Sequence, residues 1–148
     1  MEEVPYNYEQ SITEIRYDFV SKSQDKNVAK RVSFTTSNYQ NIYNLALLDV
    51  LEGGEVSDIS ESRNRDMKTI LATVIRITEE FLNKNQQSIV IFKGSDERRQ
   101  RLYRLVISRD ITEIQKKFTV FGTLLNQKPE KFKPNRPYVY FIITKKSQ

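Results

Sequence analysis

The sequence predicts an α+β domain, with a mixed, mainly antiparallel sheet of about six strands and two main helices in the order βββαβαββ. Three observations support this class. Apolar and polar residues alternate in several segments between residues 15 and 50, as in half-buried strands. Apolar residues then recur at every third or fourth position between residues 67 and 82, as in an amphipathic helix. Finally, 148 residues without a composition change that would divide the chain match one ordinary domain, residues 1–148.

Strands are expected over residues 15–19 and 32–35, because apolar side chains alternate there with charged or hydroxyl ones. The polar residues 23–27 between them suit a hairpin connection. A third strand is expected over residues 42–50, and two glycines follow it. Residues 52–65 are polar and have neither period, which indicates a long loop with a functional role or mobility.

The first helix is expected from Met67 to Leu82, where one face is continuously apolar. Either Asp66 or Asn64 is suited to cap its first amides. At the other end, Lys84 favours the carbonyl end of the helix dipole.

Residues 88–92 form a short apolar run, which predicts a central strand covered on both faces. A second helix is expected from Asp96, with a break near Ser108 before a further helical piece. Its expected apolar stripe consists of Leu102, Leu105 and Val106. Two closing strands follow, over residues 119–125 and 137–145.

The composition restricts the chemistry that is available. The chain has no Cys and no His, so disulfides, thiolate nucleophiles, thiolate metal sites and the commonest general base are all excluded. Neither a cofactor nor a metal is indicated, and any catalysis would use carboxylates, Tyr, Lys or Arg. The acidic start lacks the apolar core of a secretory signal, and no apolar run approaches the roughly 20 residues that span a membrane. A reducing cytoplasm is the expected location.

Charge is distributed unevenly along the chain. Residues 1–92 hold 10 Lys and Arg against 14 Asp and Glu, whereas residues 93–148 hold 14 against 5. An imbalance of this kind bears on association rather than on fold. It predicts either an acidic partner for the carboxy-terminal part or pairing between the two parts of the chain.

The segment GSDERRQRLYR, residues 94–104, concentrates this positive charge. A glycine and Ser95 before a helix resemble a phosphate cradle. However, Asp96 and Glu97 would repel a phosphate, so Ser95 as a helix cap is favoured.

Four arginines on three helical turns repel one another unless acids or a polyanion offset them. Two are expected on one flank of the apolar stripe, namely Arg101 and Arg104. Arg99 and Tyr103 are expected on the other flank, where Tyr103 would stack on a nucleic-acid base. Arg98 would lie along the stripe. Internal ion pairs, with Asp49 and Asp66 as candidate partners, are the favoured alternative.

A second basic segment, KPEKFKPNR at residues 128–136, links the closing strands. Phe132 among its lysines resembles the pattern of nucleic-acid grooves, although lysines also protect edge strands from pairing, which is favoured. The acidic residues between 49 and 66 fit no spaced calcium loop, so no metal site is expected.

Several motifs together resemble a family of uncharacterised bacterial proteins common in Bacteroidota, a domain of unknown function. These motifs are YNLALLD (43–49), N-x-D (64–66) with ILATV (70–74), GS (94–95), R-x-RLYR (99–104) and YVYFII (138–143). The resemblance implies a small cytoplasmic α+β protein without an assigned activity. It also implies a polar network around strand and helix ends, formed by Asn44, Asp49, Asn64, Asp66, Ser95, Arg99, Arg101 and Arg104. Relatives tend to carry Gly at the position of Arg65 and Thr-x-Ala at 96–98, which weakens the anion-site hypothesis here.

We therefore expect a non-enzymatic interaction module whose basic carboxy-terminal surface meets an acidic protein or nucleic acid. The tentative binding residues are Ser95, Arg99, Arg101, Tyr103 and Arg104. Two alternatives stay open. One is an enzyme that uses carboxylate and arginine residues in a polar pocket, and the other is a self-associating protein such as a dimer.

Overall fold

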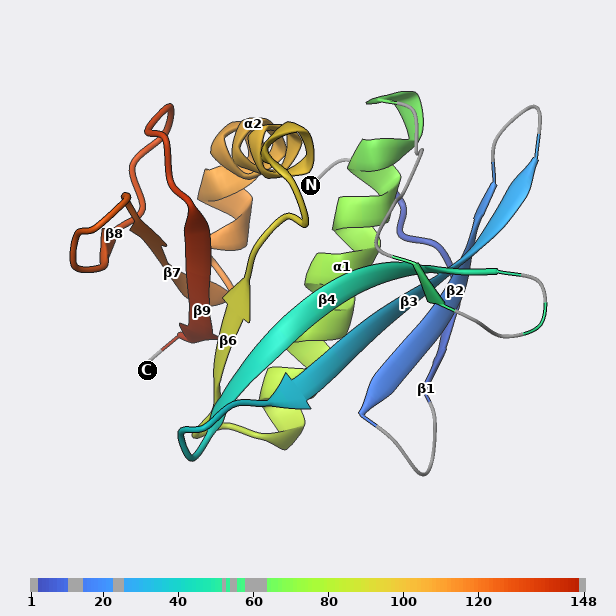
Figure 1. Ribbon diagram of the computed structural model, residues 1–148, viewed down its shortest axis with the longest axis horizontal. Coiled ribbons are helices and arrows are strands. Elements are labelled where there is room, and N and C mark those ends of the chain that lie inside the picture. Colours follow the sequence, from blue (N-terminus) through green and yellow to red (C-terminus); the bar gives the residue numbers. More distant parts are fainter. Residues whose placement is uncertain are drawn as a thin grey trace.

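The computed structural model describes residues 3–10, 15–22, 26–51, 53, 56–57 and 64–146. They form nine strands in one mixed sheet, with two helices packed against it (Figure 1). The strands are β1 (Tyr8–Gln10), β2 (Arg16–Lys22), β3 (Asn27–Thr36), β4 (Ile42–Val50), β5 (Val56–Ser57), β6 (Ile89–Phe92), β7 (Phe118–Thr123), β8 (Glu130–Lys131) and β9 (Tyr140–Lys145). The helices are α1 (Asn64–Lys84) and α2 (Glu97–Ile114).

The predicted α+β class is confirmed, but the sheet has three more strands than expected. The additional strands are β1, β5 and β8, of 3, 2 and 2 residues. Segments this short cannot display a period-two pattern, so sequence periodicity does not reveal them. Strand β5 and the first two residues of α1 fall within the predicted 52–65 loop. Residues 52, 54–55 and 58–63 of that loop lie outside the described residues.

Strands β1 to β4 form an antiparallel meander at one end of the sheet. The predicted pairing of the first two main strands is confirmed, with Arg16 opposite Ser33 and Lys22 opposite Asn27. The tip of their connection, residues 23–25, lies outside the described residues. This meander joins the rest of the sheet through β4, which pairs in parallel with β6.

The sheet order is β1-β2-β3-β4-β6-β9-β7-β8, so β9 lies between β6 and β7. Strand β9 is antiparallel to both neighbours, which makes β6 and β7 parallel to each other. Two crossovers result, β4-α1-β6 and β6-α2-β7, and both proceed in the same direction across the sheet. Because such crossovers are right-handed, both helices lie on the same face (Figure 1).

Helix α1 buries the apolar stripe that the sequence predicts and ends at Lys84, as expected. The ring of Phe81 stacks on that of Phe34 from β3, with centroids 4.0 Å apart. Asp66 does not cap the helix. Its carboxylate instead accepts hydrogen bonds from the hydroxyls of Tyr6 and Ser21, which ties the helix start to β2 and the N-terminal segment.

Helix α2 differs from the prediction in two ways. It continues through Ser108 without a break, and Leu105 is 54% exposed. The side it buries carries Gln100, Tyr103, Ile107 and Ile114. The predicted stripe through Leu105 is therefore wrong, and Arg98, predicted to lie along it, is exposed.

The prediction that β6 is covered on both faces is also wrong. Val90 and Phe92 are buried under the helices, whereas Ile89 and Ile91 on the opposite face are half-buried. The described part of the chain thus forms two layers, with the helices on one side of the sheet.

Candidate functional site

The candidate site surrounds the turn between β6 and α2, where Gly94 and Gln100 are in close contact. The Gly94 amide donates to the Oε1 atom of Gln100 at 2.7 Å, and the Nε2 atom of Gln100 donates to the Tyr138 carbonyl at 3.0 Å. A Cβ at residue 94 would lie 2.5 Å from the Gln100 backbone nitrogen, so only glycine fits. Gln100 is buried because the chain satisfies both ends of its amide.

Asp96 caps helix α2. Its Oδ1 atom accepts from the Arg99 amide at 2.8 Å, and its backbone is extended, as expected for a capping residue. The prediction of Ser95 as the cap is therefore wrong by one residue. Ser95 lies in the turn before the helix and is exposed.

Two of the four arginines are matched by acids on their own helix. Arg99 forms an ion pair with Asp96, and Arg104 forms one with Glu97 at 2.7 Å. Arg104 also donates to the Tyr138 carbonyl at 3.0 Å. Arg98 and Arg101 are exposed and form no ion pair within the described part of the chain. The prediction that Asp49 or Asp66 forms an ion pair with these arginines is therefore wrong, because Asp49 bonds Lys30 and Asp66 bonds Tyr6 and Ser21.

Tyr103 is buried, at 3% exposure, and its ring stacks on Phe92 with centroids 4.7 Å apart. It cannot stack on a base, so its predicted role in binding is wrong. Burial raises the pKa of its hydroxyl to about 12; Arg99 opposes this shift, while Asp96 and Asp49 add to it. Asp49 and Arg99 thus both act on the Tyr103 hydroxyl electrostatically, although Asp49 forms its own bond with Lys30.

The predicted polar network is only partly assembled. Asp49 accepts from Lys30 of β3 at 2.5 Å, in a pair buried on the helix-covered face of the sheet. Asp66 lies at the same end of the fold and bonds Ser21 and Tyr6. Asn44 is exposed on the opposite face of β4, away from this cluster. The side chain of Asn64 lies outside the described residues.

The second basic segment packs against α2. The Asn135 amide donates to the Ser108 Oγ atom at 3.3 Å, and Arg104 bonds the Tyr138 carbonyl as described above. Phe132 is buried against the rings of Tyr138 and Phe141, so it offers no surface for a base. Its resemblance to a nucleic-acid groove residue is therefore wrong, although the lysines around it are exposed.

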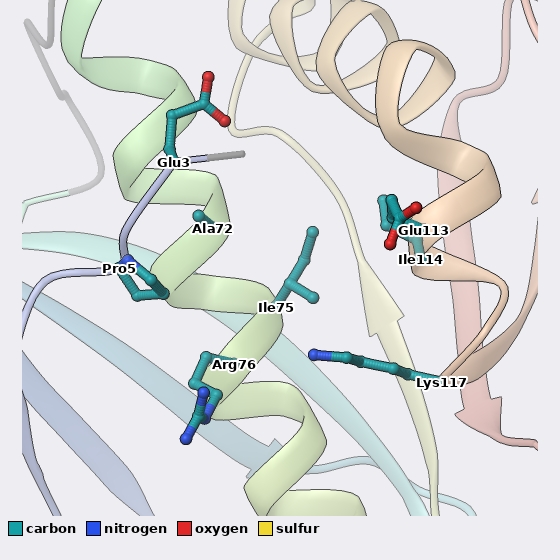
Figure 2. Close-up of a pocket in the computed structure, with 8 residues that line it drawn as sticks. All are labelled: Glu3, Pro5, Ala72, Ile75, Arg76, Glu113, Ile114 and Lys117. Carbon is teal, nitrogen blue, oxygen red and sulfur yellow. The ribbon is translucent and has the colours of Figure 1, made fainter. Parts of the chain in front are cut away.

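A cavity of about 250 Å³ lies between the N-terminal segment, α1 and the end of α2 (Figure 2). In Figure 2, Lys117 extends toward Ile75, whereas Arg76 points away from them. Three of the four charged residues that line it form ion pairs in the fold. These pairs are Glu3–Arg109, Lys117–Glu79 and Glu113–Lys116. The cavity therefore fits a junction between segments better than a ligand site.

The described residues contain neither a membrane-spanning helix nor a cluster of metal ligands. Neither helix is long and apolar enough to cross a membrane. Nor do three or more carboxylate side chains gather as a metal site would require.

The motifs and this geometry can be compared with known proteins. The model of the Family of unknown function (DUF6934) matches residues 2–146. The chain belongs to this family. Membership in DUF6934 confirms the resemblance to a family without an assigned function, while its bacterial distribution stays a prediction. No curated protein matches the chain, and no solved structure matches it.

Beside α2, this DUF6934 domain also has a cleft that its sequence pattern does not predict. This cleft lies next to the Gly94 turn and is lined in part by Thr123 and Tyr140. These residues come from β7 and β9, which meet the turn only through the strand order. No local motif marks them.

Proposed function

We propose that this protein is a non-enzymatic interaction module that binds an acidic partner, with nucleic acid as the first ligand to test. The binding region is the basic surface formed by α2 and the 128–136 loop. We define this surface by its exposed cations, Arg98, Arg101, Lys128, Lys131 and Lys133.

The observation that carries this proposal is the packing of two basic segments that are distant in sequence. Asn135 bonds Ser108, and Arg104 bonds the carbonyl of Tyr138, two residues after the loop, so the end of the loop is held beside the helix. Residues 93–104 and 128–136 together contain nine Lys and Arg against three acids. Concentrated positive charge of this kind attracts polyanions and speeds their association.

The chemistry of the surface also limits the mode of binding. Tyr103 and Phe132, the aromatic residues expected to stack on bases, are both buried. Recognition would therefore depend on phosphate or carboxylate groups rather than on bases. Such binding depends steeply on salt concentration and discriminates weakly between sequences.

The test is binding of a fluorescent single-stranded RNA and of polyglutamate, measured over a range of salt concentrations. Arg98→Ala combined with Arg101→Ala should weaken binding and lower the salt slope for the RNA by about 1.4, because each phosphate contact on a single strand releases about 0.7 counterion. The matched control is Lys22→Ala with Lys68→Ala, which removes the same charge from exposed positions elsewhere. Equal binding by the two double variants, or no binding by the unmodified protein, would reject the proposal.

Two other functions compete with this one. An enzyme would be favoured if Asp49 or Asp66 shared a pocket with an arginine, but their bonds go to Lys30, Tyr6 and Ser21. Self-association through a sheet edge finds little support, because the outer strands β1 and β8 have only 3 and 2 residues. Light scattering on the purified protein distinguishes self-association from the other two.

A further inference from the structure

We propose that the cleft beside the Gly94 turn is a second binding site, for a neutral saccharide. The cleft has a volume of about 600 Å³, within the usual range of roughly 300–1,000 Å³ for small-molecule sites. The β6–α2 turn forms one wall, the residues that follow β7 form the other, and Tyr140 contributes from the start of β9. This site is independent of the basic surface.

Thr123 is the first indication of a ligand. It lines the cleft and is 3% exposed, and its hydroxyl oxygen has no hydrogen-bond partner among the described residues. A buried hydroxyl without a partner is unfavourable, and native structures rarely leave one unexplained. The hydroxyl oxygen itself is closed to solvent, so a ligand hydroxyl satisfies it once the Thr123 side chain turns toward the cleft, since hydroxyl groups both donate and accept.

The charges around the cleft favour a neutral ligand. Asp96 and Glu97 line it, so an incoming anion meets two carboxylates. Lys93 and the positive end of the α2 dipole act against a cation. The two carboxylates already bind Arg99 and Arg104, so they need no further positive charge. They keep lone pairs that accept hydrogen bonds from hydroxyl groups.

The remaining lining suits a sugar. Asn126 and Gln127 supply exposed amides, each with donors and an acceptor. Tyr140 presents a half-buried ring, and Leu125 is 70% exposed at the same cleft. The ring and the leucine provide an apolar surface for the C–H face of a pyranose, while the polar groups bond its hydroxyls.

The experiment is a glycan array that carries neutral mono- and oligosaccharides beside sialylated and sulfated ones, followed by calorimetry with the best neutral saccharide. Thr123→Val should weaken that binding about tenfold, the effect of one hydrogen bond. It should leave the thermal midpoint unchanged or higher, because the hydroxyl has no partner to lose. The matched control Thr119→Val changes the same strand outside the cleft and should bind normally.

Tyr140→Ala provides an independent test and should also weaken binding. The variant Arg98→Ala with Arg101→Ala should bind the saccharide normally, which separates this site from the basic surface. The proposal is overturned if no neutral glycan binds, if only charged glycans bind, or if Thr123→Val and Tyr140→Ala both bind like the unmodified protein.

Discussion

The ring of Tyr138 lies against the backbone of Gly122, so closely that a Cβ at residue 122 would fall 2.4 Å from the Cδ1 atom of the ring. The Tyr138 hydroxyl donates to Glu130 at 2.7 Å and accepts from the Lys133 amide at 3.0 Å. Burial raises the pKa of this hydroxyl, and the Glu130 bond adds to the shift. Tyr138 therefore connects β7 to the 128–136 loop.

Gly122→Ala should destabilise the protein by about 1–3 kcal/mol, because the new methyl group overlaps the Tyr138 ring. Urea unfolding measures the change. Gly53→Ala is the control: no described residue lies within 4 Å of a Cβ added there, although its φ of +89 adds strain. Gly53→Ala should lower the free energy of unfolding by about 1 kcal/mol. An unchanged urea midpoint for Gly122→Ala would show that the ring does not lie where we describe it.

Asp49→Ala should cost about 3–5 kcal/mol, because it removes the carboxylate that accepts from the buried Lys30 ammonium. Lys30→Met combined with Asp49→Leu should recover most of this loss. The control is Asp18→Ala, which breaks the 2.7 Å pair with Arg31 on the other face of the same sheet. That pair is partly exposed and should contribute less than about 1 kcal/mol. Similar losses at Asp18 and Asp49 would contradict the burial we assign to the Lys30 pair.

Asp96→Ala should destabilise α2 by about 1 kcal/mol, because the Arg99 amide loses its acceptor. Asp96→Asn keeps an oxygen at the same position and should retain most of the stability. Thermal unfolding of both variants at moderate salt makes the comparison. If both substitutions cost the same, the charge of Asp96 matters and its capping bond does not.

The stability of the protein should fall as the pH rises above about 10, the usual pKa of tyrosine in an unfolded chain. Burial raises the pKa values of Tyr17 and Tyr103 to about 12, so the unfolded state loses these protons first. Between these pH values each tyrosine contributes a loss of up to about 1.4 kcal/mol per pH unit. Below pH 10 the stabilisation that comes from these two raised pKa values is fully present.

Tyr103→Phe tests this assignment, because phenylalanine keeps the contact with Phe92 and removes the titrating group. Its free energy of unfolding should fall less between pH 9 and pH 11 than that of the unmodified protein. Tyr39→Phe changes an exposed tyrosine and should leave the pH dependence as it was. Parallel pH profiles for the Tyr103 variant and the unmodified protein would argue against the raised pKa.

The sequence alone predicts α1 because its apolar spacing is local and continuous. It does not predict which side of α2 is buried. Gln100 becomes a core residue only because the Tyr138 carbonyl, 38 residues away, accepts from its amide. Leu105 is apolar, but no element covers it in the described structure.

The candidate site, too, can be predicted from the sequence only in part. The arginines of α2 and the basic loop are visible as composition, and so is the positive charge they create. The partners of these arginines cannot be predicted from the sequence, because Arg104 bonds residues that are seven and 34 positions away. The aromatic residues Tyr103 and Phe132 looked suited to stacking on bases, but burial excludes both, and only the strand order decides burial.

The position of β9 has a consequence for synthesis of the chain. This strand follows all the others in sequence but fills an interior place between β6 and β7. A nascent chain that has not yet released β9 from the ribosome leaves both neighbours with unpaired backbone edges, which are prone to aggregation. The carboxy-terminal half therefore completes its hydrogen bonding only after translation has passed residue 145.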